Sequence, residues 1–150
     1  GYWNLAEVKL AQGKLEETIS LLQTAVELEP GVGYSHWYLA MAYKIAGQNQ
    51  LAKEELIKTE EFGFNWHNNI ERLKEAIKVY NALGDDNNLL PLYLKATELA
   101  PNDAQLWASL AATHANLGQF KEAGEAAKKV ITIDPTLAPL VEKFLKALPQ

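Results

Sequence analysis

The sequence contains no cysteine, and this excludes disulfide bonds, cysteine-based zinc sites and thiol catalysis. Arginine is nearly absent as well: Arg72 is the single one among 14 basic residues. Against 19 acidic residues, these give a formal net charge of −5. A mildly acidic chain of this kind is a poor electrostatic match for nucleic acid, so no nucleic-acid partner is expected.

Long apolar runs are also missing. No run approaches the roughly 20 residues that a helix needs to cross a bilayer, so no membrane insertion by this segment is expected. No signal-peptide pattern is present, and the first residue is Gly1 where a complete chain would begin with methionine. We therefore expect a piece of a longer protein, and its localisation stays open.

What the chain does contain is a repeat marked by glycines. Four of them follow an apolar helical pattern at separations of 34, 37 and 34 residues: Gly13, Gly47, Gly84 and Gly118. Eight residues before each glycine stands a leucine or an alanine: Leu5, Leu39, Ala76 and Leu110. Seventeen residues after them stand Pro30, Phe64, Pro101 and Pro135. A period of this length indicates stacked helical hairpins.

Each copy predicts two amphipathic helices, the first ending at its glycine and the second near its proline. First helices are expected near residues 2–12, 34–46, 68–83 and 103–117. Second helices are expected near residues 15–28, 49–61, 88–100 and 120–133. Pro91 fits the third of these if Asn88 is the N-cap, because proline is tolerated in a first helical turn.

A further helix is expected after the last copy. Its apolar residues lie on one stripe: Leu137, Val141, Phe144, Leu145 and Leu148. Such a helix would cover the apolar face that the final hairpin leaves open.

These features resemble the tetratricopeptide repeat family over nearly the whole chain. The fourth copy carries the closest match: Pro101-Asn102-Asp103-Ala104, then Trp107, Leu110, Ala111, Gly118, Ala123 and Pro135. The resemblance implies an all-α fold, a right-handed superhelical solenoid of four helix-turn-helix repeats plus a C-terminal capping helix. We expect one domain over residues 1–150, with the parts 1–32, 33–66, 70–103, 104–136 and 137–148.

The second copy departs from the family pattern. Phe64 replaces its proline, and three extra residues enter between Phe62 and Asn69, where Gly63 is the expected helix breaker.

The resemblance also implies a concave groove lined by the first helices, at positions ten, six and three residues before each glycine. The expected partner-binding residues are these positions and their flanks: Trp3, Glu7, Leu10, Tyr34, Trp37, Tyr38, Met41, Lys44, Lys74, Lys78 and Asn81. Uncovered aromatic and methionine side chains favour a protein or peptide ligand with apolar anchors. Lys74 and Lys78 would face an acidic group on that ligand.

Other interpretations of the groove stay open. Trp37 and Tyr38 can pack against Trp3 and fill a narrow groove themselves, and the two lysines can belong to an ordinary solvated face. In the fourth copy the groove wall consists of alanines: Ala108, Ala112 and Ala115. This wall either offers a ligand little to grip or marks the place where the closing helix lies.

No constellation of residues indicates catalysis, a cofactor or a metal. His36 and His114 occupy positions expected in the core, and no two histidines share metal-ligand spacing. The run from Asp85 to Asn88 lacks the alternating ligands of a calcium loop. The glycines form no phosphate-binding loop. We therefore expect no enzymatic activity, no cofactor and no metal site.

The sequence thus predicts a non-enzymatic protein–protein interaction or scaffold module. Two alternatives remain. The stretches YWNLAEVKLAQG and VEKFLKALP resemble the C-terminal repeat tails of bacterial membrane polysaccharide polymerases or ligases of the O-antigen type. Alternatively, the apolar face of the N-terminal repeat pairs with a second copy to form a homodimer.

Overall fold

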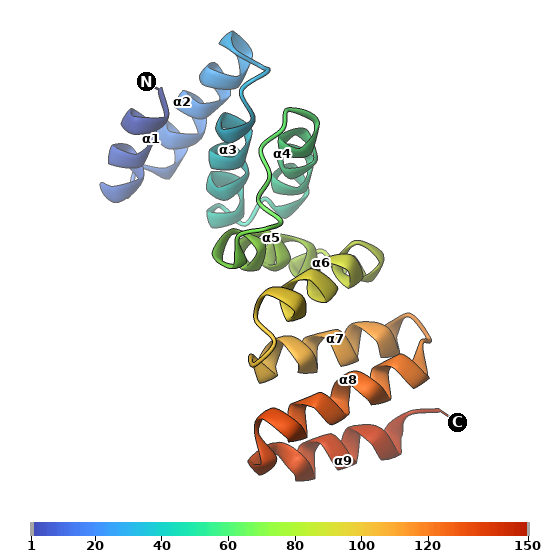
Figure 1. The fold of residues 1–150 in the computed structure, drawn as a ribbon. Coiled ribbons are helices and arrows are strands. Elements are labelled where there is room, and N and C mark those ends of the chain that lie inside the picture. The colour runs from blue at the N-terminus through green and yellow to red at the C-terminus, as the bar shows by residue number, and fades with distance from the viewer. Residues whose placement is uncertain (1, 150) are drawn as a thin grey trace. The chain divides into compact units, whose positions relative to one another are not determined.

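The structure is a computed structural model that describes the backbone of residues 2–149, and the side chains of residues 5, 6 and 8–149. Within these residues all regular structure is helical, and no strand occurs. The four hairpins are α1 (Tyr2–Ala11) with α2 (Leu15–Leu28), α3 (Gly33–Ile45) with α4 (Asn49–Glu61), α5 (Ile70–Ala82) with α6 (Asp86–Leu99), and α7 (Ala104–Asn116) with α8 (Phe120–Ile133). A short 3-10 helix, η1 (Pro135–Leu137), leads into the closing helix α9 (Ala138–Ala147). The expectation of an all-α fold with four helix pairs and a closing helix is confirmed (Figure 1).

The glycines end the first helices as the sequence predicts. All four have positive φ, which a residue without Cβ adopts at little cost. At the end of α3, the Gly47 amide donates to the Lys44 carbonyl, and the next amide donates to the Tyr43 carbonyl. This pair of bonds satisfies carbonyls that the helix leaves open.

The described chain divides into two compact units, Gly1–Trp66 and His67–Gln150, where the sequence led us to expect one domain. The first unit holds α1 to α4, and the second holds α5 to α9. Each unit is described by itself below.

Small residues bring the paired helices together in the first unit. Ala40 on α3 and Ala52 on α4 are fully buried, and Leu39 and Leu56 fill the space beside them. The second unit repeats this arrangement: Ala76 on α5 and Ala96 on α6 are fully buried, as is Ala123 on α8, while Ala111 on α7 is 2% exposed. None of the helices in the described part of the chain has the length and apolar composition of a membrane span.

Helix α6 begins earlier than the sequence predicts. Its N-cap is Asp85, whose side chain accepts a hydrogen bond from the Asn88 amide, so the proposal of Asn88 as the cap is wrong. Pro91 consequently lies inside the helix, beyond its first turn. Because proline has no amide hydrogen, the Asn87 carbonyl lacks its usual helical donor.

Candidate functional site

The predicted groove residues divide between the two units. Trp3 and Glu7 belong to α1, but their side chains lie outside the described residues. On α3 the structure places Tyr34 at the surface, with 42% of it exposed. Four further positions are half-buried: Leu10, Tyr38, Met41 and Lys44.

Trp37 is a core residue. Only 7% of it is exposed, and its ring lies 5.8 Å from the Phe64 ring and 6.2 Å from the Trp66 ring, centroid to centroid. The expectation that Trp37 is an uncovered anchor on the groove wall is therefore wrong. Among the described side chains, Phe64 and Trp66 from the segment after α4 cover it. The alternative interpretation, packing against Trp3, falls on a side chain outside the described residues.

This covering segment, residues 62–66, is the insertion that distinguishes the second copy. Gly63 has a φ of 75°, as expected of a helix breaker, and the Phe64 amide then donates to the Thr59 carbonyl. The Trp66 indole nitrogen donates to the Thr59 hydroxyl at 2.7 Å, and that hydroxyl donates to the Leu56 carbonyl. These bonds satisfy the buried polar atoms and hold both aromatic rings against Trp37.

His36 connects three parts of the first unit and is buried, as the sequence predicts. Its Nδ1 lies 2.6 Å from a Glu55 carboxylate oxygen, and its Nε2 lies 2.7 Å from the Pro30 carbonyl oxygen. Its ring stacks on Phe62 with centroids 5.3 Å apart. Glu55 is also buried and accepts a second bond, of 3.0 Å, from the Lys58 ammonium.

In the second unit, both groove lysines contact acids of the chain itself. Lys74 lies 3.2 Å from Asp103, whose other carboxylate oxygen accepts from the Gln105 amide and caps α7. Lys78 lies 2.8 Å from Glu75 on the same helix. A ligand carboxylate would compete with these contacts. Asn81, the last predicted residue of this set, is exposed.

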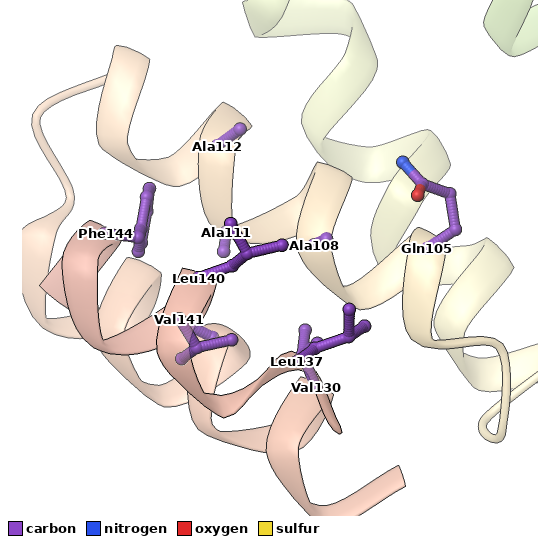
Figure 2. A pocket seen from close by; sticks show the side chains of 10 residues that line it. Gln105, Ala108, Ala111, Ala112, Val130, Leu137, Leu140, Val141 and Phe144 are labelled. Atoms are coloured by element: carbon purple, nitrogen blue, oxygen red, sulfur yellow. The ribbon is translucent and has the colours of Figure 1, made fainter. Parts of the chain in front are cut away.

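The second unit contains an apolar cavity of about 250 Å³. We call it the α7–α9 cavity. Figure 2 shows side chains of α7 and α9 around it. Its lining comes from α7, α8, η1 and α9: Gln105, Ala108, Ala111, Ala112, Ala127, Val130, Leu137, Leu140, Val141 and Phe144. Gln105 is the one polar side chain of this set, so the cavity favours an apolar occupant.

The cavity exists because the α7 wall is made of alanines. The sequence left open whether this wall offers little to grip or receives the closing helix, and α9 does lie across from it. Leu140 and Phe144 reach toward the wall without filling the space that the short alanine side chains leave. Leu140 remains 67% exposed.

A second hollow, of about 580 Å³, lies between side chains of α1 and α2. Leu5 lines it together with polar side chains, and Lys9 forms a 2.7 Å ion pair with Glu17 at its wall. The hydrogen bond from Lys9 lowers the pKa of this exposed carboxyl. Leu5 and Val8 on α1 are 47% and 52% exposed, so an apolar surface remains open here.

The described residues contain no group of three or more histidines and carboxylates placed to hold a metal ion. His114 is buried, as expected, with its Nδ1 lying 2.7 Å from the side-chain oxygen of Gln119.

Helical hairpins joined through positive-φ glycines, with small residues where paired helices meet, define a helical-repeat protein. The family model described as tetratricopeptide repeat matches residues 92–125, from within α6 to within α8. Over these residues the match confirms the resemblance seen in the sequence.

Solved structures of tetratricopeptide repeat proteins share the fold. YrrB, described as a TPR protein with an unusual peptide-binding site, is 23% identical, with 89% of this chain and 68% of that chain covered and a TM-score of 0.74. MamA from Desulfovibrio magneticus RS-1 is 21% identical, with 89% and 74% covered and a TM-score of 0.70. No curated protein matches the chain.

Proposed function

We propose that the chain is a non-enzymatic protein-interaction module that binds a peptide by inserting one large apolar side chain into the α7–α9 cavity. The cavity itself is the observation that carries this proposal. Its lining is almost entirely hydrocarbon. Apolar cavities on the order of 150 Å³ already bind molecules as small as benzene.

The energy available suits a peptide ligand. Burying one leucine or phenylalanine side chain contributes about 1.5–3 kcal/mol. Gln105 in the lining offers both a donor and an acceptor, which suits the backbone of the residue that is inserted. The fold adds support, because YrrB shares it and is described as having a peptide-binding site.

The first unit contributes differently to this proposal than the sequence predicted. With Trp37 in the core, the predicted groove residues of α3 that remain at least partly exposed and could contact an apolar ligand are Tyr34, Tyr38 and Met41. Lys74 and Lys78 remain candidates for an acidic ligand group, at the cost of their contacts with Asp103 and Glu75.

The test is to fill the cavity. N-acetyl-phenylalaninamide and N-acetyl-leucinamide serve as probes, and methyl NMR shifts of Ala112 and Leu140 report binding. Ala108→Leu should abolish those shifts, because the longer side chain occupies the space. Ala115→Leu is the matched control, since Ala115 lies on the same helix and does not line the cavity. Equal shifts in the wild type and in Ala108→Leu would refute the proposal.

Self-association is the second candidate, favoured by the exposure of Leu5 and Val8 on α1. Light scattering at several concentrations tests it, and Val8→Asp should abolish any dimer.

The third possibility, the repeat tail of a polysaccharide polymerase or ligase, depends on sequence upstream in the gene. A block of membrane spans there would support it.

A further inference from the structure

The first turn of α7 carries several polar groups that are bonded within the chain. The Asp103 side chain accepts hydrogen bonds from the Gln105 and Leu106 amides. The Trp107 amide donates to the Asp103 carbonyl, and the Trp107 indole nitrogen donates to the Pro101 carbonyl at 2.8 Å. A ligand could bond to these amides only by breaking the cap of α7.

The side-chain amide of Gln105 differs from these groups. No other described residue forms a hydrogen bond with it. Gln105 is exposed and lines the α7–α9 cavity, and Figure 2 shows its nitrogen and oxygen as the polar atoms among the hydrocarbon side chains of the lining. A primary amide carries two N–H donors and an oxygen that accepts. A ligand in the cavity therefore meets a group that can both donate and accept.

The backbone of an extended peptide matches this amide. An extended residue has an N–H and a C=O that its own chain does not pair, whereas in a helix both are bonded inside the ligand. A helical ligand depends instead on apolar anchors over several turns. The alanine wall gives little room for that, because the alanines that line the cavity span about one turn of α7: Ala108, Ala111 and Ala112.

We propose that Gln105 determines the specificity of the α7–α9 cavity, and that the peptide bound there is an extended segment. The inference rests on the proposed function, since it concerns the same ligand. The apolar side chain of the anchor residue fills the cavity, and the backbone N–H and C=O of that residue bond to the Gln105 amide. A plain hydrocarbon of similar size fills the cavity equally well and gains nothing from Gln105.

The test compares two ligands that share a phenyl ring. N-acetyl-phenylalaninamide has an amide on each side of its anchor residue, and ethylbenzene has none. Titrations followed by the methyl NMR shifts of Ala112 and Leu140 give the Kd of each ligand for the whole chain. Gln105→Met removes the amide and keeps the length of the side chain. It should weaken binding of N-acetyl-phenylalaninamide about two- to tenfold and leave binding of ethylbenzene unchanged.

Asn116→Ala is the matched control. Asn116 also carries an exposed amide on α7, but it lies at the far end of the helix and does not line the cavity. This variant should bind both ligands as the wild type does.

Two peptides test the conformation of the ligand on the wild type. In acetyl-alanyl-phenylalanyl-prolinamide, the proline keeps the phenylalanine extended. A lactam-bridged helical peptide carries one phenylalanine at its centre. The extended peptide should bind at least as tightly as N-acetyl-phenylalaninamide, and the helical peptide should bind about two- to tenfold more weakly than the extended one.

Three results would overturn the inference and leave the proposed function intact. They are an equal loss of both phenyl ligands in Gln105→Met, no loss of either, and a helical peptide that binds as tightly as the extended one. Absence of NMR shifts with every probe would refute the proposed function, and the inference with it. The peptide comparison needs no variant, so it decides the matter even if Gln105→Met fails to fold.

Discussion

Gly33 and Phe64 approach so closely that no side chain fits between them. A Cβ placed on Gly33 would lie 2.7 Å from the Cβ of Phe64 and 3.0 Å from the Phe62 carbonyl oxygen. The first turn of α3 and the segment after α4 are therefore matched to one another. The cover over Trp37 depends on a glycine that lies thirty-one residues before Phe64 in the sequence.

Gly33→Ala should destabilise the first unit by about 1–3 kcal/mol, because backbone atoms must move to admit the methyl group. Thermal unfolding gives the change, and acrylamide quenching of tryptophan fluorescence should increase as the 62–66 segment lifts. Gly31→Ala is the control, since a Cβ there meets nothing within 4 Å. A melting temperature for Gly33→Ala as high as that of the control would contradict this account.

Thr59→Val should also loosen the cover. The Trp66 indole nitrogen is buried and donates to the Thr59 hydroxyl, so the variant leaves a buried donor without its partner. Such a loss costs about 1–3 kcal/mol. Thr59→Ser keeps the hydroxyl and should retain most of the stability measured by urea unfolding. The idea fails if the serine and valine variants unfold at the same urea concentration.

Asp103 should matter more to stability than its ion-pair partner Lys74. Asp103→Ala removes the N-cap of α7 and should cost roughly 1 kcal/mol. Lys74→Met removes only a partly exposed ion pair, which contributes about 0–1 kcal/mol. Asp103→Asn should behave like Lys74→Met, because an amide oxygen still caps the helix. Denaturant titration of the three variants measures the loss of stability in each. An equal loss from Asp103→Ala and Lys74→Met would contradict the prediction.

Pro91→Ala should stabilise the second unit. The residue is exposed within α6, and alanine restores the amide donor that the Asn87 carbonyl lacks. The gain should be about 1 kcal/mol or more, since interior proline is costly in a helix. Calorimetry measures it. An unchanged or lower melting temperature would show that the helix has already adapted to the proline.

The helices could be predicted because their signals are local. Apolar residues at helical spacing, with a glycine after each first helix, place the helices to within two residues. The start of α6 shows the limit: the run from Asp85 to Asn88 offers four residues that can all serve as caps. The choice among them is made by tertiary packing, which overrides local preference.

The environment of Trp37 could not be predicted in the same way. Its cover comes from the 62–66 segment, more than twenty residues later, and no periodic pattern links the two. A signal was nevertheless present, because Phe62, Phe64 and Trp66 alternate in an insertion that has no place in the repeat. Aromatic residues of this kind need a surface to pack on.

The α7–α9 cavity depends on how much space the backbone leaves between α7 and α9, and no spacing of residues in the sequence gives that volume. The sequence shows both the alanines of α7 and the apolar stripe of α9. It also allows the prediction that these two surfaces lie against one another. Whether Leu140 and Phe144 fill the space between them depends on the path of the backbone through η1.

Helix α9 is attached to the second unit through few side chains, with Val141 as its buried residue. Any molecule seated between it and the alanine wall of α7 would bind to both helices at once. By mass action, such a molecule adds its own binding free energy to the docking of α9. Slower trypsin cleavage after Lys143 and Lys146 would then report occupancy, so the C-terminal end of the chain can serve as the sensor for a ligand search.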